Sequence, residues 1–451
     1  MNYVNTLLQL CTLKNQAKCN KKQMKKIQND KLRKLLRYAW ENSVYYRRTF
    51  EKSGIGEEDL DTLPLSCFPT ISKKEFLESF DELVTVPDLK QEELRKFDAE
   101  NKVDSKVYKG KYHIVHSSGS TGKPGYFVYD GQAWKTMLLG IIRAALWEMS
   151  MPEIVGLLCK KPKIVYVAAT DGRYGGAMAV GDGIDDLRAR KMYLDINEPM
   201  EQWIDKLNRF QPDIVIGYPS AIKIMGELTE KSYVNLKIKR IITCGEPLGH
   251  SLRRYLEDLF QCIVINFYGA SESLALGVES DPEGGMLLFD DLNLIEVENG
   301  RLFLTCLYNY AQPLIRYELS DHLILEESKK GDMYPFTKAK GLIGRNEDII
   351  WFSDENGNEE FLHPLAIEGF CIDGLKDYQF RKTSRDSFEM YAEVCEYAEK
   401  EEIRADMTGQ MRKILEEKGL GYVKFYVIFV EEILPLPETG KKPLILPELK
   451  S

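Results

Sequence analysis

A run rich in hydroxyl, glycine and lysine side chains is the strongest chemical signal in the sequence. Residues 117–124 read Ser-Ser-Gly-Ser-Thr-Gly-Lys-Pro. Glycines let the backbone approach a phosphate, and the N–H groups of such a turn form a nest that binds anions. Hydroxyls and the lysine add donors and positive charge. The run predicts a phosphate site formed by Ser117, Ser118, Gly119, Ser120, Thr121, Gly122 and Lys123, with a flexible surface loop as the alternative.

This run is not a Walker A loop. Ser117 stands where that motif has its first glycine, and Pro124 follows the lysine where Ser or Thr is required. A phosphate site of another class is therefore expected.

A second run lies directly after the apolar segment 263–267. It reads Tyr268-Gly269-Ala270-Ser271-Glu272. An aromatic ring at a strand end can stack on a purine. A carboxylate four residues later can hold a magnesium ion that bridges phosphates. Taken alone this run is weak evidence, because Tyr-Gly after a strand is commonly only a turn.

Three further runs place polar groups at the ends of apolar segments. Residues 243–247 form a Gly–Pro turn that could lie flat against a ring, and Asp321 suits a bidentate bond to two ribose hydroxyls. Lys441 follows Gly440 near the C-terminus, where a mobile lysine could reach across a cleft. Each run is ordinary by itself.

Strands alternate with helices in the segment that carries most of these runs. Strands are predicted at 112–116, 126–129, 164–168, 214–216, 240–243 and 263–267, and helices at 132–149, 200–209, 220–231 and 250–260. This order predicts a largely parallel sheet with helices on both faces. Ligands of such sheets bind beyond the carboxyl ends of the strands, where these runs lie.

The pattern changes after residue 285. Shorter strands are expected at 286–289, 293–298, 301–307 and 322–326, and Asn299-Gly300 is a strong hairpin signal. Residues 341–350 look like a boundary, and 351–451 mix short strands with a helix at 401–418. The predicted class is α/β: a large N-terminal domain (1–345) with mostly parallel sheets, flanking helices and a β-rich subdomain, and a small, mobile C-terminal α+β domain (346–451).

Composition excludes several classes of protein. The 451 residues are 44% hydrophobic and 29% charged, which suits a globular chain with a sizeable core. A net charge of -9 argues against nucleic acid as the main partner. Nine cysteines without C-x-x-C spacing suit reduced thiols in the cytoplasm, and no apolar run predicts a membrane span. The basic segment 14–37 is interpreted as a solvated amphipathic helix, with a membrane-surface or nucleic-acid contact as the alternative.

The order of the runs resembles the adenylate-forming superfamily of acyl-CoA synthetases, luciferases and peptide-synthetase adenylation domains. The likeness spans about residues 30–445 and is greatest to the phenylacetate–CoA ligase and capsule-biosynthesis-like branch. It rests on 116–124, on 35–39 with 43–47, and on 312–317, which leads into that branch's ribose-binding Asp.

The resemblance implies a role for each run. Residues 117–123 would hold the ATP phosphates, and Glu272 would bind magnesium. Asp321 would hold the ribose, with Arg345 nearby on ribose or phosphate. Glu347 occupies the hinge position, and Lys441 would reach the substrate carboxylate. The adenine would be lined by Gly245, Glu246, Pro247 and Tyr268, with Gly269 and Ser271 in the same nucleotide-binding run.

The sequence departs from the family at three places. The hinge residue is Glu347 where Asp is more common, and Glu318, Leu319 and Ser320 precede Asp321 where the family has an Arg-rich form. The C-terminal run is one residue shorter than the long form, so Lys442 is an alternative catalytic lysine. These departures leave the nucleotide roles unaltered but obscure the geometry of the second step.

The resemblance also implies the reaction. A carboxylic acid would be activated with ATP and magnesium to an acyl-adenylate, with release of pyrophosphate, and the acyl group passed to the thiol of coenzyme A. A carrier-protein thiol or another acceptor, and a non-catalytic nucleotide-binding module, are the alternatives. A compact apolar or aryl acid is expected from candidate acyl-pocket residues, for which core packing is the competing interpretation: Tyr129, Tyr174, Gly175, Met178, Tyr218 and Ala270.

Overall fold

The chain folds into two compact units, each built from two segments of sequence. The first unit combines 1–195 with 267–340, and the second combines 196–266 with 341–451. The computed structural model describes these residues: 3–100, 107–116, 125–168, 178–179, 182, 189–195, 198, 200–246, 248–279, 285–326, 332–345, 350–353, 359–362, 367, 370, 372–417, 419–435 and 442–446.

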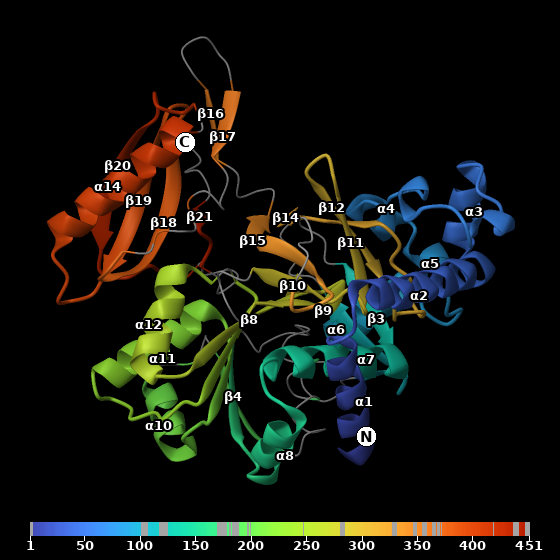
Figure 1. The fold of residues 1–451 in the computed structure, drawn as a ribbon, viewed down its shortest axis with the longest axis horizontal. Helices are drawn as coiled ribbons and strands as arrows, with labels where there is room; N and C mark the ends of the chain where they lie inside the picture. The colour runs from blue at the N-terminus through green and yellow to red at the C-terminus, as the bar shows by residue number, and fades with distance from the viewer. Residues whose placement is uncertain are drawn as a thin grey trace. The chain divides into compact units, whose positions relative to one another are not determined.

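Helices dominate the N-terminal part of the first unit (Figure 1). They are α1 (Tyr3–Gln16), α2 (Lys21–Asn42), α3 (Val44–Lys52), α4 (Lys73–Glu78), α5 (Phe80–Leu83), α6 (Gln91–Glu100), α7 (Gly131–Ala145) and α8 (Met151–Cys159). Helix α1 packs on α7 through Leu10, Leu139 and Ile142, which are all buried. Helix α7 ends at Ala145, four residues before the predicted end.

The strands of the first unit form three groups. β1 (Val107–Tyr108), β2 (Tyr112–His116) and β3 (Tyr126–Asp130) make an antiparallel sheet, as do β11 (Asn293–Glu298), β12 (Arg301–Cys306) and β13 (Tyr317–Leu319). β4 (Lys163–Ala168) pairs in parallel with β5 (Arg190–Asp195). The third group also contains β9 (Ser273–Glu279) and β10 (Met286–Leu288), which pair antiparallel, and β14 (Asp321–Leu325); these strands belong to the same sheet as β4 and β5. The pairing is therefore mixed, with parallel and antiparallel neighbours.

The predicted Asn299-Gly300 hairpin is confirmed. Glu298 pairs with Arg301 across the turn, and both turn residues have positive φ, 51° and 76°. Two consecutive positive φ values match the twist of the flanking strands.

The second unit has two parts (Figure 1). Its first segment forms α10 (Met200–Phe210), β6 (Ile214–Gly217), α11 (Pro219–Glu230), β7 (Arg240–Cys244) and α12 (His250–Phe260), with β6 parallel to β7. Strand β8 (Ile263–Ala270) begins in this unit and β15 (Thr337–Arg345) ends in it. The second segment forms β16 (Ile350–Ser353), β17 (Glu359–Leu362), β18 (Leu375–Ser384), β19 (Ser387–Val394), α14 (Lys400–Glu417), β20 (Lys424–Val430) and β21 (Ile445–Leu446).

Residues 351–451 contain the predicted mixture of strands and a helix. A sheet of order β20-β19-β18-β21 buries Phe380, Phe388 and Met390 against Met407 and Met411 of α14. This core lies wholly within residues 350–445. The predicted division at residue 345 stays a prediction, since the compact unit also takes in 196–266.

Most of the basic segment 14–37 lies in the amphipathic helix α2, as predicted, whereas residues 14–16 end α1 and 17–20 connect the two helices. Met24, Leu32, Leu35 and Leu36 are buried on one face, and some basic side chains bind the first unit. The Lys31 ammonium donates to the Asp291 carbonyl oxygen at 2.5 Å, and Arg33 donates to the Leu60 and Leu63 carbonyl oxygens. Within the described part of the chain, no helix combines the length and apolar character needed to cross a bilayer.

Two adjacent carboxylates, Asp290 and Asp291, lie in the core near α2 and α7. Asp291 forms a fully buried ion pair with Arg143, with an N–O distance of 2.6 Å. Asp290 accepts hydrogen bonds from the Thr337 backbone N–H at 2.7 Å and hydroxyl at 2.9 Å. Burial raises the pKa of Asp290 from 3.8 to about 7, despite the Thr337 bonds, and the neighbouring Asp291 charge adds to the rise.

We predict that Asp290 makes stability depend on pH. Because its folded pKa lies above its unfolded value, the folded state holds more protons between about pH 4 and pH 7. Stability should fall as pH rises through that window. Asp290→Asn keeps an oxygen acceptor for Thr337 but cannot ionise, so its Tm should fall less between pH 5 and pH 8. Scanning calorimetry at both pH values checks this, with the exposed Asp61→Asn as control. Identical falls in all three proteins would contradict it.

Candidate active site

Strands β2 and β3 bracket the predicted phosphate loop. They are antiparallel neighbours, and His116 at the end of β2 pairs with Tyr126 at the start of β3. Residues 117–124 join them in the chain. Those eight residues lie outside the described residues, as do three single predictions and one pair: Pro247, Glu347, Lys441, and Tyr174 with Gly175.

The turn after β8 lies beside the end of β2. The Ser271 hydroxyl donates to the His116 carbonyl oxygen at 3.4 Å, and the Tyr129 hydroxyl donates to the Ser271 carbonyl oxygen at 2.8 Å. The end of β2 and the turn after β8, whose contacting residues are 155 positions apart in sequence, are therefore adjacent. This is the arrangement expected if both contact one nucleotide.

Tyr268 and Asp321 form a direct pair. The Tyr268 hydroxyl donates to the Asp321 carboxylate at 2.8 Å. Burial raises the pKa of Tyr268 well above its ordinary value, and the Asp321 charge adds to the rise, so this phenol remains a donor. The Tyr268 ring is buried, while Asp321 is only partly buried. One face of the carboxylate is thus fixed while the residue keeps some exposure.

Glu272 has a similar partner in Tyr317. Burial raises the pKa of Tyr317, and the charge of Glu272 and a hydrogen bond to its carboxylate raise it further. Tyr317 lies in β13, which is tied to Ile71 by reciprocal backbone hydrogen bonds at its two neighbours: Ile71 N–H to Arg316 O and Glu318 N–H to Ile71 O. Both predicted functional carboxylates of the first unit, Glu272 and Asp321, are therefore oriented by a buried tyrosine.

Gly245 requires the absence of a side chain. Its φ is +80°, and an added Cβ would lie 2.8 Å from the Tyr218 ring. The Tyr218 ring consequently packs on the 243–246 turn, which is predicted to line the adenine. Tyr218 was predicted in the acyl pocket, and that role remains a prediction.

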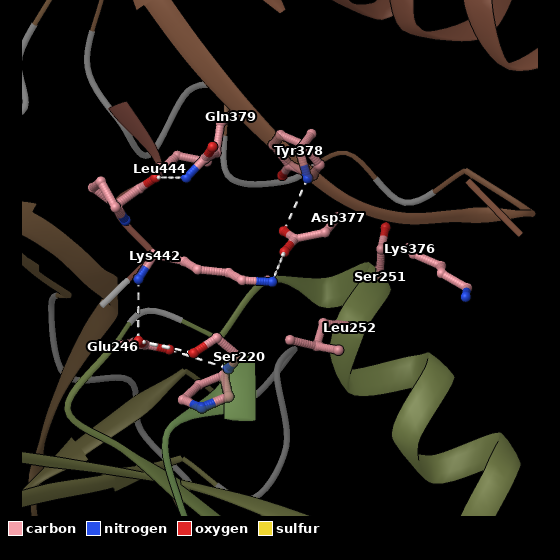
Figure 2. Close-up of a pocket in the computed structure, with 13 residues that line it drawn as sticks. Ser220, Glu246, Ser251, Leu252, Lys376, Asp377, Tyr378, Gln379, Lys442 and Leu444 are labelled. Atoms are coloured by element: carbon pink, nitrogen blue, oxygen red, sulfur yellow. Dashed lines mark hydrogen bonds and ion pairs between the residues drawn. The ribbon is translucent and has the colours of Figure 1, made fainter. Parts of the chain in front are cut away.

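Glu246 is predicted to line the adenine, but its carboxylate also accepts hydrogen bonds from two other segments. Its carboxylate accepts from the Ser220 backbone N–H at 3.1 Å, from the Ser220 hydroxyl at 3.0 Å and from the Lys442 backbone N–H at 3.1 Å (Figure 2). Ser220 lies in the first turn of α11, where an anion is favoured. Glu246 thus joins three segments of the second unit.

Lys442 borders a pocket within the second unit. The pocket lies beside the first turns of α11 and α12 and the first half of β18, with Ser220, Glu246, Asp377 and Gln379 among its walls (Figure 2). The Lys442 ammonium extends to Asp377, with an N–O distance of 4.0 Å. Burial lowers the pKa of Lys442, and repulsion from Lys223 lowers it further.

The other residues predicted for the acyl pocket or the nucleotide site lie in different elements. Tyr129 is fully buried and contacts Trp134 edge-on. Ala270 ends β8, Met178 is partly buried, and Arg345 ends β15. No group of three or more metal-ligating side chains is found among the residues that the structure describes. The predicted ligand Glu272 would share a magnesium ion with ATP phosphates, for which one carboxylate suffices.

Sequence reasoning missed several residues that support the site. Tyr317 ends the segment 312–317 on which the resemblance rests, but the sequence indicates no role for it, and it indicates none for Ser220, Lys223 or Asp377. For Tyr317, the available signal was an aromatic residue four positions before Asp321 in an apolar strand. No local pattern links Asp377 to Lys442, which is 65 residues away.

Comparisons with known proteins give a consistent group of relatives. Phenylacetate-coenzyme A ligase of Pseudomonas putida is 24% identical over 396 residues, covering 81% of each chain. Protein CapK of Staphylococcus aureus is 22% identical over 468 residues, covering 97% of this chain and 92% of its own. No family profile matches the chain.

The fold is shared with a solved ligase. A 2-hydroxyisobutyryl-CoA ligase, in its postadenylation state with 2-HIB-AMP, matches with a TM-score of 0.69 at 18% identity. The match covers 93% of this chain and 88% of that one. The predicted α/β class, with a large helix-flanked sheet and additional β-rich parts, is confirmed.

We predict that Gly269→Ala destabilises the turn that carries Glu272. A Cβ at residue 269 would lie 2.4 Å from the Leu274 carbonyl oxygen, so the backbone must move. The loss should be about 1–3 kcal/mol, as for other overpacked sites. Chemical denaturation measures it. Gly131→Ala in α7, where nothing lies within 4 Å of the new Cβ, is the control. Equal stability of both variants would show that the turn tolerates a side chain.

Proposed function

We propose that this chain, which belongs to the adenylate-forming superfamily and to its phenylacetate–CoA ligase-like branch, is an acid–thiol ligase. It activates a carboxylic acid with ATP to an acyl-adenylate, releases pyrophosphate, and transfers the acyl group to the thiol of coenzyme A. Relatives named as ligases, matched over most of the chain, support this reaction.

One observation carries the proposal for this chain. The end of β2, the Tyr268–Glu272 run and Asp321 lie together, joined by the Ser271–His116 and Tyr268–Asp321 hydrogen bonds. The Tyr268–Glu272 run and Asp321 have predicted nucleotide roles, and the end of β2 leads directly into the predicted phosphate run 117–123; the three are far apart along the chain. Core packing alone gives no reason for polar groups from these runs to converge.

The proposed chemistry asks the protein mainly to position charges. A carboxylate oxygen of the acid attacks the α-phosphorus, and the bond to pyrophosphate breaks. Asp321 accepts hydrogen bonds from the ribose hydroxyls while the Tyr268 hydroxyl holds its other side. Ser117–Lys123 and Lys441 are proposed to face the phosphates and the reacting carboxylate, where negative charge accumulates.

A magnesium ion fits the donor set that the chain offers. Glu272 provides a carboxylate oxygen, which is a ligand type that magnesium prefers. The Tyr317 hydrogen bond orients this carboxylate. When bound, the ion would neutralise charge on the phosphates.

The C-terminal part is proposed to act as a lid, with 1–345 as the main domain and 346–451 turning about Glu347 between the two half-reactions. The acid is proposed to be aryl or otherwise compact and apolar, and the setting cytoplasmic. Coenzyme A is the proposed acceptor. An acyl carrier protein is the alternative that an assay must distinguish.

Exchange of labelled pyrophosphate into ATP tests the activity directly. We expect exchange with magnesium and ATP only when a suitable carboxylic acid is added, because the reverse reaction requires acyl-adenylate. A panel of aryl and short aliphatic acids should contain at least one active member. Thioester formation is then compared with coenzyme A and with a carrier protein. If a folded sample shows no pyrophosphate exchange with any acid of the panel, the proposal is contradicted.

Glu272→Gln tests the proposed magnesium ligand. The change keeps size and hydrogen-bonding capacity but removes the charge, so exchange should fall about a hundredfold or more, as for one lost preorganised electrostatic contact. Tm without ligand should hardly change. Glu78→Gln, at an exposed residue of the same unit, is the control. Wild-type exchange by Glu272→Gln would remove this residue from the site.

A further inference from the structure

Lys442 is held at its backbone by Glu246. Its N–H belongs to the peptide bond that follows Lys441, and it donates to the Glu246 carboxylate at 3.1 Å. The same carboxylate binds the first turn of α11 through both the N–H and the hydroxyl of Ser220. A charged acceptor makes these bonds stronger than neutral ones. Position 442 is therefore fixed to the end of β7 and to α11.

Lys442 is held a second time at its side chain. Only 7% of this side chain is exposed, and its ammonium lies 4.0 Å from the Asp377 carboxylate. Asp377 is also 3.8 Å from the Lys223 ammonium, which is 1% exposed and contacts Glu393. Burying an ammonium is costly unless a carboxylate is close. Lys442 thus depends on Asp377, and Asp377 connects it to the buried Lys223–Glu393 pair.

Figure 2 shows both contacts on one residue. The Lys442 backbone points to Glu246, and its side chain runs in a different direction to Asp377 on β18. Glu393 is further engaged by the Ile433 backbone N–H at 2.9 Å. A lysine whose ammonium serves this cluster cannot at the same time place that ammonium on a substrate.

We propose that Glu246, Lys442 and Asp377 form a clamp, in which Lys442 and Asp377 are positioning residues that set the C-terminal lysine run for adenylation. The inference rests on the proposed function. The clamp fixes the peptide group next to Lys441, so that Lys441 and not Lys442 supplies the reacting charge. Thiol transfer needs no lysine at the α-phosphate, so the clamp is dispensable for that step.

The test separates the two half-reactions in Asp377→Asn, Lys442→Met and the double variant. Each single change should lower kcat for ATP–pyrophosphate exchange by about ten- to hundredfold, as for a displaced reacting group. The double variant should be no slower than the slower single one, because both changes remove the same contact. Thioester formation from synthetic acyl-adenylate and coenzyme A should stay within about twofold of wild type.

Asp213→Asn is the matched control. It removes a carboxylate from an exposed ion pair with Lys239 in the same unit, at 2.6 Å, away from the clamp. Its exchange rate should equal that of wild type. Inactive Lys442→Met beside fully active Asp377→Asn would overturn the clamp and make Lys442 the catalytic lysine. Additive losses, or equal losses in both half-reactions, would also overturn it.

Hydrogen–deuterium exchange tests the clamp without any activity. The peptide segment 442–446 should be protected in wild type and in Asp213→Asn, and should lose protection in Asp377→Asn. If Asp377→Asn fails to fold, Lys442→Met provides the comparison, since it leaves Asp377 to balance Lys223. Unchanged protection in a folded clamp variant would overturn the inference. If the segment is protected in wild type and loses protection in the variant, but no protein catalyses ATP–pyrophosphate exchange, only the proposed function would be refuted.

Discussion

The cost of taking carboxylates partly out of water is the physical constraint on which both units depend. Asp321 is held by Tyr268, Glu272 by Tyr317, Asp291 by Arg143, and Glu246 by Ser220 and Lys442. A buried donor lowers this cost and fixes the direction of the carboxylate at the same time. The residues that stabilise the fold are in this way also the residues that orient the candidate site.

Two of these carboxylates lie at strand ends of one sheet, because Glu272 follows β8 and Asp321 begins β14. The end of β2 belongs to another sheet and is joined to the turn after β8 by the Ser271–His116 hydrogen bond. None of these side chains needs to be near another in sequence. The first unit also contains antiparallel pairs, β2 with β3 and β9 with β10. These pairs provide sheet edges that a purely parallel sheet would lack.

The proposed clamp extends the same constraint to the second unit. Lys223 is buried and must have a carboxylate close by, and Glu393 and Asp377 meet that need. Asp377 can then accept a second ammonium, that of Lys442, while Glu246 takes the Lys442 backbone. Two independent contacts restrict one residue far more than either would alone, which is why this position suits a role in placing the adjacent lysine.

The sequence by itself determined many of the helices, strands and turns, and it indicated the chemistry that each run could perform. Helix α12 has its predicted bounds, and the Asn299-Gly300 turn forms as expected, because caps, periodicity and turn residues are local properties. The residues proposed to bind the nucleotide were suggested by their type, since phosphate, ribose and magnesium each require particular donors. Strands β5 and β9 were not predicted, because their apolar residues lack a clear period.

Only the tertiary structure decided which groups are partners. The Tyr268–Asp321 and Tyr317–Glu272 pairs depend on how strands from distant segments meet. The choice between Lys441 and Lys442 was open in the sequence because both residues carry the same charge. The contacts of Lys442 with Glu246 and Asp377 are the basis on which we propose Lys441 as the reacting lysine. They join residues 196 and 65 positions apart, a proximity that no local pattern encodes.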